Sequence, residues 1–149
     1  MAMVDVSEKP EIFREATATG TIKLKAKTTA MIKEGRIAKG DPVHTAKIAG
    51  ILAAKNTSNL IPLCHPLPLT NVEVKVEIEN PTTIRATAKV KTRASTGVEM
   101  EALTATTTAL LTIWDMVKQY EKDEKGQYPS TEIGSIRVVK KIKKGSKKD

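Results

Sequence analysis

The chain has 149 residues, which is enough to bury a core without covalent staples, and its single cysteine excludes an internal disulfide framework. No uninterrupted apolar run approaches the roughly 20 residues of a membrane span, and acidic residues stand where a signal peptide needs an apolar core. We therefore expect a soluble, cytoplasmic protein. The expected organisation is one domain over residues 1–149, with an N-terminal arm at 1–12 and a basic tail at 143–149.

The formal net charge of +8 is concentrated at one end of the chain. Residues 140–149 contain six lysines and one aspartate, so the remainder is close to balanced. A basic tail is typical of proteins that meet an anionic partner, although many such tails are simply solvated. The charge alone leaves nucleic acid, phosphate groups and no specific partner as open alternatives.

The first third of the chain predicts one strand and two helices. β-branched residues within 13–27 favour a strand, and a short helix is expected over 28–35 before a glycine. Asp41 can accept hydrogen bonds from the first free amides of a helix, and Pro42 fits its first turn. We expect that second helix to cover residues 43–56.

Residues 60–68 (LIPLCHPLP) hold the only cysteine, one of two histidines and three of the seven prolines. Prolines restrict the backbone, so this connector should fix where Cys64 and His65 point. Adjacent residues on extended backbone face opposite ways, which disfavours a nucleophile and base pair. One cysteine and two histidines cannot complete an ordinary zinc site without carboxylates, so we predict no metal site. The prolines favour a binding role for His65 over a purely structural one, and His44 has no predicted role.

Residues 72–79 and 84–91 alternate between apolar and charged side chains, the period of half-buried strands. The turn residues Asn80 and Pro81 separate them, which predicts an antiparallel hairpin. The register implied by burial pairs Ile78 with Ile84, Glu77 with Arg85 and Glu73 with Lys89. Opposite charges then meet on the solvated face.

A long helix is expected from a capping box at Thr96 and Glu99 to about Glu121. Its predicted apolar stripe consists of Met100, Leu103, Thr107, Leu110, Trp114 and Val117. Glu99 and Glu101 do not share a helix face. We therefore predict that Glu99 caps the helix and that the Glu101 side chain points to a functional site. A polar loop over 122–131 and a closing strand over 133–142 complete the chain.

Asp115 and Lys118 lie one turn apart on that helix. Such a pair is either a plain surface contact or, at a cleft, a proton acceptor beside a cationic donor. Lysines at or near helix and strand ends would hold a polyphosphate if the fold gathered them: Lys39, Lys47, Lys55, Lys118 and Lys141. There is no Walker-type loop, which disfavours ordinary P-loop hydrolysis.

The expected order is βαββαβ, so we predict an α+β, ferredoxin-like fold with helices on one face of an antiparallel sheet. Its motifs resemble the MoaC family, the cyclic pyranopterin monophosphate synthases of molybdenum cofactor biosynthesis. The matching segments are 39–41 (KGD), 48–51 (IAGI), 53–55 (AAK), 60–67 (LIPLCHPL), 96–105 (TGVEMEALTA) and 111–116 (LTIWDM). The resemblance covers nearly the whole chain.

This resemblance implies conversion of a 3′,8-cyclised dihydro-GTP, made by a MoaA-type radical-SAM enzyme, to cyclic pyranopterin monophosphate and diphosphate. It implies substrate contacts at Leu63, Cys64, His65, Glu99, Met100 and Glu101, and site lysines at Lys39, Lys55 and Lys141. Asp115 would be the catalytic aspartate and Lys118 its partner. The implied assembly is a hexamer, a trimer of dimers with active sites at subunit interfaces. No cofactor is implied, although a divalent cation could accompany the triphosphate.

Two other function classes fit the composition. A small basic RNA-binding domain of this topology would stack bases on strand aromatics, but the predicted hairpin contains none. We therefore expect no nucleic-acid partner. A purely structural assembly subunit would show no thermal shift with nucleotide.

Overall fold

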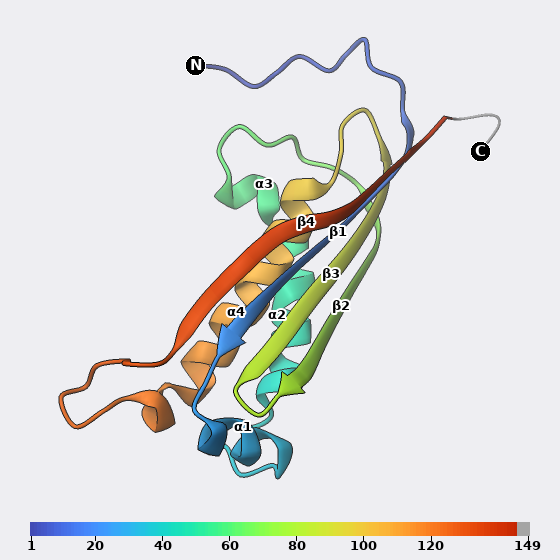
Figure 1. Ribbon diagram of the computed structural model, residues 1–149. Coiled ribbons are helices and arrows are strands. Elements are labelled where there is room, and N and C mark those ends of the chain that lie inside the picture. The colour runs from blue at the N-terminus through green and yellow to red at the C-terminus, as the bar shows by residue number, and fades with distance from the viewer. Residues whose placement is uncertain (146–149) are drawn as a thin grey trace.

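The computed structural model describes residues 1–145 as a four-stranded antiparallel sheet in the order β2-β3-β1-β4, with helices covering one face (Figure 1). The elements in chain order are β1 (Ile12–Lys23), α1 (Ala26–Lys33), α2 (Pro42–Lys55), α3 (Thr57–Leu60), β2 (Leu69–Asn80), β3 (Thr83–Ala94), α4 (Glu99–Glu121) and β4 (Glu132–Lys144). This confirms the predicted α+β, ferredoxin-like architecture. Lys143 and Lys144 belong to β4, and residues 146–149 of the expected tail lie outside the described residues.

Two local predictions are confirmed at the ends of the early helices. Asp41 is the N-cap of α2, and its Oδ1 accepts hydrogen bonds from the N–H groups of Val43 (3.0 Å) and His44 (3.2 Å). Gly35 follows α1 with a φ of 71°, a conformation that glycine adopts without strain. These ends are set by neighbouring residues, so the sequence pattern suffices to place them.

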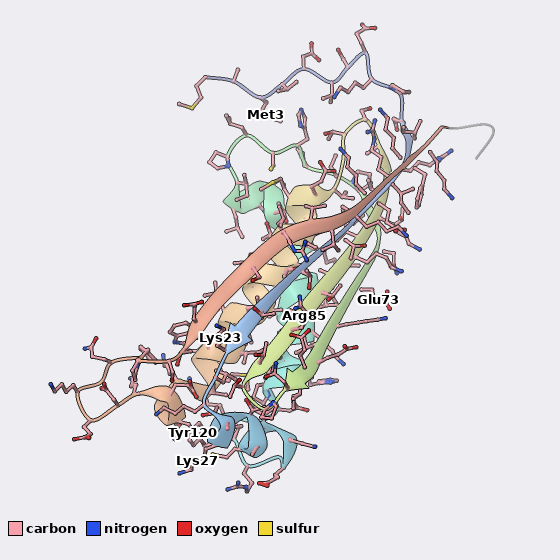
Figure 2. All side chains as sticks on the ribbon, in the orientation of Figure 1. Met3, Lys23, Lys27, Glu73, Arg85 and Tyr120 are labelled. Carbon is pink, nitrogen blue, oxygen red and sulfur yellow. The ribbon has the colours of Figure 1, made fainter. Side chains whose placement is uncertain are left out.

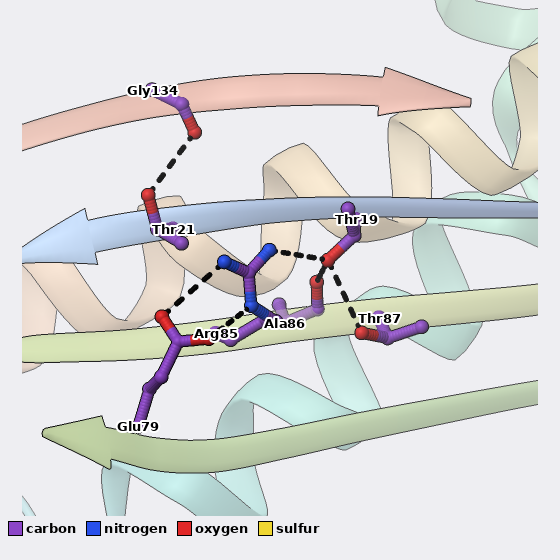
Figure 3. A network of polar contacts seen from close by, with 7 residues as sticks. All are labelled: Thr19, Thr21, Glu79, Arg85, Ala86, Thr87 and Gly134. Carbon is purple, nitrogen blue, oxygen red and sulfur yellow. Dashed lines mark hydrogen bonds and ion pairs between the residues drawn. The ribbon is translucent and has the colours of Figure 1, made fainter. Parts of the chain in front are cut away.

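The predicted hairpin register is correct in all three pairs. Lys89 and Glu73 form an ion pair at 3.5 Å, whereas Arg85 reaches diagonally to Glu79 instead of to Glu77 (Figure 3). Arg85 also donates to Thr19 of β1 at 3.1 Å. Glu73 and Arg85 lie on the face of the sheet that the helices leave open (Figure 2). Polar contacts therefore tie β2, β3 and β1 together on the solvated face.

The predicted apolar stripe of α4 is confirmed at Leu110 and Val117, which are fully buried, and at Leu103 and Trp114, which pack against the core. It is wrong at Met100, which is 39 % exposed, and it omits the small residues of the buried face, with Ala102, Ala105 and Ala109 fully buried. A Cβ on Gly50 of α2 would lie 3.1 Å from the Ala105 carbonyl oxygen, so the two helices approach very closely. Close packing selects small residues for this contact.

The predicted capping box is also wrong. Helix α4 begins at Glu99 with Val98 as its N-cap, and no side chain caps it. Val98 is fully buried, which anchors the helix start two residues later than a cap at Thr96 would require. The Glu99 carboxylate instead lies 3.6 Å from Lys141 of β4, a tertiary contact that the local motif does not encode.

Glu121, the last residue of α4, is fully buried and joins three parts of the fold. Its carboxylate accepts hydrogen bonds from the Lys25 N–H (3.1 and 3.3 Å), from the Thr28 hydroxyl and from the Thr131 hydroxyl (2.6 Å). These donors lie before and within α1 and just before β4. A buried carboxylate is tolerated when donors satisfy it in this way.

Replacing Glu121→Ala should lower the free energy of unfolding by about 2–4 kcal/mol, because the donors lose their acceptor and a cavity remains. Urea titration followed by circular dichroism measures the change. The matched control is Glu124→Ala in the exposed loop, which should shift stability by less than about 0.5 kcal/mol. Equal stabilities for the two variants would contradict this account of Glu121.

Candidate active site

The predicted connector and the start of α4 line one pocket of about 260 Å³, which we call the His65 pocket. Its walls include most of the predicted substrate contacts: Leu63, Cys64, His65, Glu99, Met100 and Glu101. A turn closed by the hydrogen bond from the Cys64 N–H to the Ile61 carbonyl oxygen (3.1 Å) lies in the first half of the connector. Cys64 and His65 both line the pocket, and the hydrogen bond of the His65 ring goes to the N-terminal arm and not to Cys64.

The N-terminal arm forms another wall of the His65 pocket, which sequence reasoning missed. Val4, Val6 and Lys9 line the pocket, and the arm crosses above the connector (Figure 1). His65 Nε2 lies 2.7 Å from the Val4 carbonyl oxygen. Because a carbonyl oxygen only accepts, Nε2 carries the proton in this contact, which leaves Nδ1 of a neutral ring as an acceptor.

Glu101, which was predicted to point to a site, is only 4 % exposed and lines the His65 pocket. Burial raises the pKa of its carboxyl group, and the nearby negative charge of Glu99 raises it further. The pKa of the Cys64 thiol is raised as well, first by burial and then by the charge of Glu101. The pocket therefore favours a protonated thiol and a carboxyl group that holds its proton to higher pH than an ordinary glutamate.

Arg14 of β1 supports the loop that leads into α4, and the sequence offered no signal for it. Its Nε donates to the Ala94 carbonyl oxygen at 3.0 Å and its Nη2 to that of Ser95 at 3.4 Å. The side chain is buried at the end of β3. Arg14 therefore helps to hold the backbone before Gly97 and Glu99 in place.

Asp115 lies between Lys118 and Lys39. The sequence predicted the pair with Lys118. Asp115 Oδ1 is 3.0 Å from Lys118 Nζ, and its Oδ2 is 3.2 Å from Lys39 Nζ. The hydrogen bond from Lys118, followed by that from Lys39, holds the pKa of Asp115 below its usual range. Asp115 in turn raises the pKa of Lys118. At neutral pH this site presents a carboxylate acceptor beside two ammonium groups.

Aromatic side chains line the site around Asp115, which we call the Asp115 pocket. This shallow pocket of about 440 Å³ is walled by Asp115, Lys118, Trp114 and Tyr128, together with two aliphatic residues. The Trp114 and Tyr128 rings lie 5.1 Å apart at a tilt of 59°. Sequence analysis missed Tyr128, because it belongs to a polar loop that showed no periodic pattern.

Lys39 is held by its neighbours at this end of the molecule. The Ala38 N–H donates to the Tyr120 hydroxyl at 2.9 Å, and Lys39 Nζ also donates to the Asp115 carbonyl oxygen at 3.0 Å. Tyr120 lies near the end of α4, beside α1 (Figure 2). The loop before α2 is therefore fixed against α4 where Lys39 meets Asp115.

The His65 pocket is lined by the first residues of α4, whereas the Asp115 pocket is lined by residues of its second half. Glu101 and Asp115 are 14 positions apart on the helix, a separation of about 21 Å at 1.5 Å per residue. Helix α2 runs antiparallel to α4, since Gly40 lies beside Met116 and Gly50 beside Ala105. Lys55 at its far end thus lies toward Glu101, whereas Lys39 lies at Asp115.

The predicted lysines do not gather at one place in the described chain. Lys39 and Lys118 meet at Asp115, Lys141 pairs with Glu99, and Lys47 and Lys55 belong to α2. Within residues 1–145, no three His, Cys, Asp or Glu side chains gather so that they could hold a metal ion. In the same residues, no helix has the length and apolarity needed to cross a membrane.

Comparison with known proteins assigns the chain to a family. The family model described as MoaC matches residues 3–145. The chain belongs to the MoaC family. This confirms the family predicted from the sequence motifs and, with it, the prediction of an enzyme.

Three archaeal relatives show how far the similarity extends. A probable cyclic pyranopterin monophosphate synthase of Sulfolobus acidocaldarius is 59 % identical over 95 % of this chain and 98 % of its own length. Proteins of the same name from Sulfurisphaera tokodaii and Pyrococcus abyssi are 58 % and 56 % identical over 95 % of this chain, covering 93 % and 88 % of their lengths. The MoaC similarity therefore includes both pockets.

The single cysteine gives a direct test of the His65 pocket. Glu101→Gln removes the negative charge that raises the pKa of Cys64, so the variant should have a lower thiol pKa and more thiolate at pH 8. We expect faster reaction with a disulfide reagent, followed by absorbance across a pH series. Glu77→Gln on the exposed sheet surface is the control and should react like the unmodified protein. An unchanged or slower reaction of Glu101→Gln would contradict the assigned coupling.

Proposed function

We propose that this MoaC-family enzyme converts a 3′,8-cyclised dihydro-GTP to cyclic pyranopterin monophosphate and diphosphate. A MoaA-type radical-SAM enzyme would supply the substrate. Family membership supports the reaction class, and the names of the relatives support the product. The observation that carries the proposal is the Asp115 carboxylate held between Lys39 and Lys118, within hydrogen-bond reach of both.

The Asp115 pocket has the groups that repeated proton transfer requires. Opening the purine ring and closing the pterin and pyran rings move several protons, and positioned acids and bases contribute about 10²–10⁴-fold each. Asp115 has a lowered pKa and accepts protons at neutral pH, whereas Lys118 has a raised pKa and stays charged. The carboxylate is the base and the ammonium is the acid in this assignment.

The phosphate chemistry needs positive charge on the leaving group. A ribose hydroxyl attacks the α-phosphorus atom and forms the cyclic phosphate, while the bond to the β-phosphate oxygen breaks and diphosphate leaves. Lysine ammonium groups stabilise the negative charge that develops on that oxygen. We assign this task to the site lysines: Lys39, Lys55 and Lys141. A divalent cation could accompany the triphosphate as part of the substrate.

The His65 pocket suits the guanine-derived ring. A carboxylate at Glu101 accepts the N–H donors of such a ring, and its raised pKa also lets it return a proton at higher pH than an ordinary glutamate. Leu63 of the connector and Met100 of α4 supply apolar contacts in the pocket. Cys64 has a raised thiol pKa, so in this assignment its uncharged thiol lines the pocket and does not act as a nucleophile.

We further propose that each active site forms where the His65 pocket of one copy meets the Asp115 pocket of another. No side chain on one rigid helix spans about 21 Å, so a single chain does not bring the two groups to one substrate. Exposed apolar side chains on the outer surfaces of α2 and α4 are available to bury between copies: Ile48, Leu52, Met100 and Leu111. The expected assembly is the trimer of dimers.

Asp115→Asn should lower product formation by about 100- to 10,000-fold, the contribution of one general acid or base. The side chain is 60 % exposed, so fold and oligomeric state should be unchanged. Mass detection of the cyclic phosphate after incubation with GTP, S-adenosylmethionine and a MoaA-type enzyme measures turnover. Glu34→Gln, at an exposed carboxylate paired with Arg36, is the control. Turnover near that of the unmodified protein would remove Asp115 from the catalytic role.

Mixed assemblies test the shared site. Asp115→Asn chains keep an intact His65 pocket, and Glu101→Gln chains keep an intact Asp115 pocket. When both variants are co-expressed and assemble at random, about a quarter of the shared sites combine an intact His65 pocket from one chain with an intact Asp115 pocket from another. Activity should rise well above that of either variant alone. A mixture no more active than its parts would show that the two pockets do not combine between chains.

A further inference from the structure

The Glu99 carboxylate lies in the space that a side chain on Gly97 would fill. A Cβ built on Gly97 would overlap Glu99 Oε1 and would lie 3.0 Å from Cδ and 3.2 Å from Oε2. Gly97 is not among the glycines with positive φ, so its backbone does not require glycine. The observed position of the Glu99 carboxylate instead requires that residue 97 has no Cβ atom.

The same carboxylate has one satisfied and one unsatisfied oxygen. Oε2 is 3.6 Å from Lys141 Nζ, whereas Oε1 is buried and accepts no hydrogen bond within residues 1–145. A buried acceptor without a donor raises the free energy of the folded state, and an arriving donor removes this cost. Gly97, Glu99 and Glu101 all line the His65 pocket, so Oε1 is available to a donor that enters there.

We propose that Gly97 is a positioning residue, because its missing Cβ lets the Glu99 carboxylate fold back into the His65 pocket and accept an N–H or O–H donor of the substrate. The identity of that substrate rests on the proposed function. The geometry of Gly97 and Glu99 does not. Arg14 supports this arrangement by holding the backbone of the preceding residues.

Replacing Gly97→Ala should move the carboxylate and leave the fold intact. The overlapping atoms are the far end of a flexible side chain, which can rotate away without displacing backbone. Alanine also restricts the unfolded chain, which stabilises a protein where the native backbone suits it. The unfolding temperature should therefore stay the same or rise slightly, which separates a positioning role from a structural one.

The first test needs no turnover. In protein labelled with ¹³C at glutamate carboxyl groups, Gly97→Ala should shift the Glu99 resonance, assigned by its loss in Glu99→Ala. Gly134→Ala is the matched control, because its Cβ would meet only Glu132 Oε2 at an ordinary 3.8 Å. A Glu99 resonance that stays in place in Gly97→Ala overturns the proposal.

The second test is a double-mutant cycle on substrate turnover. Gly97→Ala should raise KM by about ten- to a hundredfold, the range for one lost hydrogen bond to a charged group, with kcat near its original value. In a Glu99→Ala background the same change should have no further effect, because Gly97 acts through Glu99. Equal effects in both backgrounds, or an unchanged KM, overturn the proposal. Absence of product from the unmodified protein contradicts the proposed function, and the carboxyl resonance still decides the role of Gly97.

Discussion

The continuous backbone hydrogen bonding of the 23-residue helix α4 is the constraint on which both pockets depend. A straight helix rises 1.5 Å per residue, so the distance between Glu101 and Asp115 is set before any side chain is placed. Close packing through Gly50 and Ala105 holds this helix against α2 and prevents it from shifting. Neither pocket can therefore move toward the other within one chain, and this separation is the reason for proposing a site shared between two copies.

The two ends of α4 place their carboxyl groups in opposite environments. Glu101 is buried near another carboxylate, and its pKa is raised. Asp115 is exposed between two ammonium groups, and its pKa is lowered. Carboxyl groups whose pKa values are driven apart take different parts in acid–base chemistry. In the proposed function, the environment rather than the residue type decides that Glu101 binds the ring and Asp115 transfers protons.

Sequence predicted the parts of this fold that depend on near neighbours. The hairpin register follows from alternating burial, and the start of α2 follows from Asp41 and Pro42 alone. The start of α4 and the small residues of its buried face were missed, because both depend on tertiary packing: Val98 is buried against the core, and the close approach of α2 selects small residues such as Ala105. Motif resemblance supplied the candidate site residues and implied active sites at subunit interfaces. It did not indicate which of these residues lie far apart in one chain.

Two features of the His65 pocket have no side-chain signature at all. The Val4 carbonyl oxygen meets His65 at 2.7 Å, and any residue at position 4 would present the same backbone group. At Gly97 the relevant feature is an atom that is missing, and the space it leaves holds the Glu99 carboxylate. The family motif around Gly97 and Glu99 therefore has a steric meaning as well as a chemical one. The glycine determines where the carboxylate lies, and the carboxylate determines what the pocket can bind.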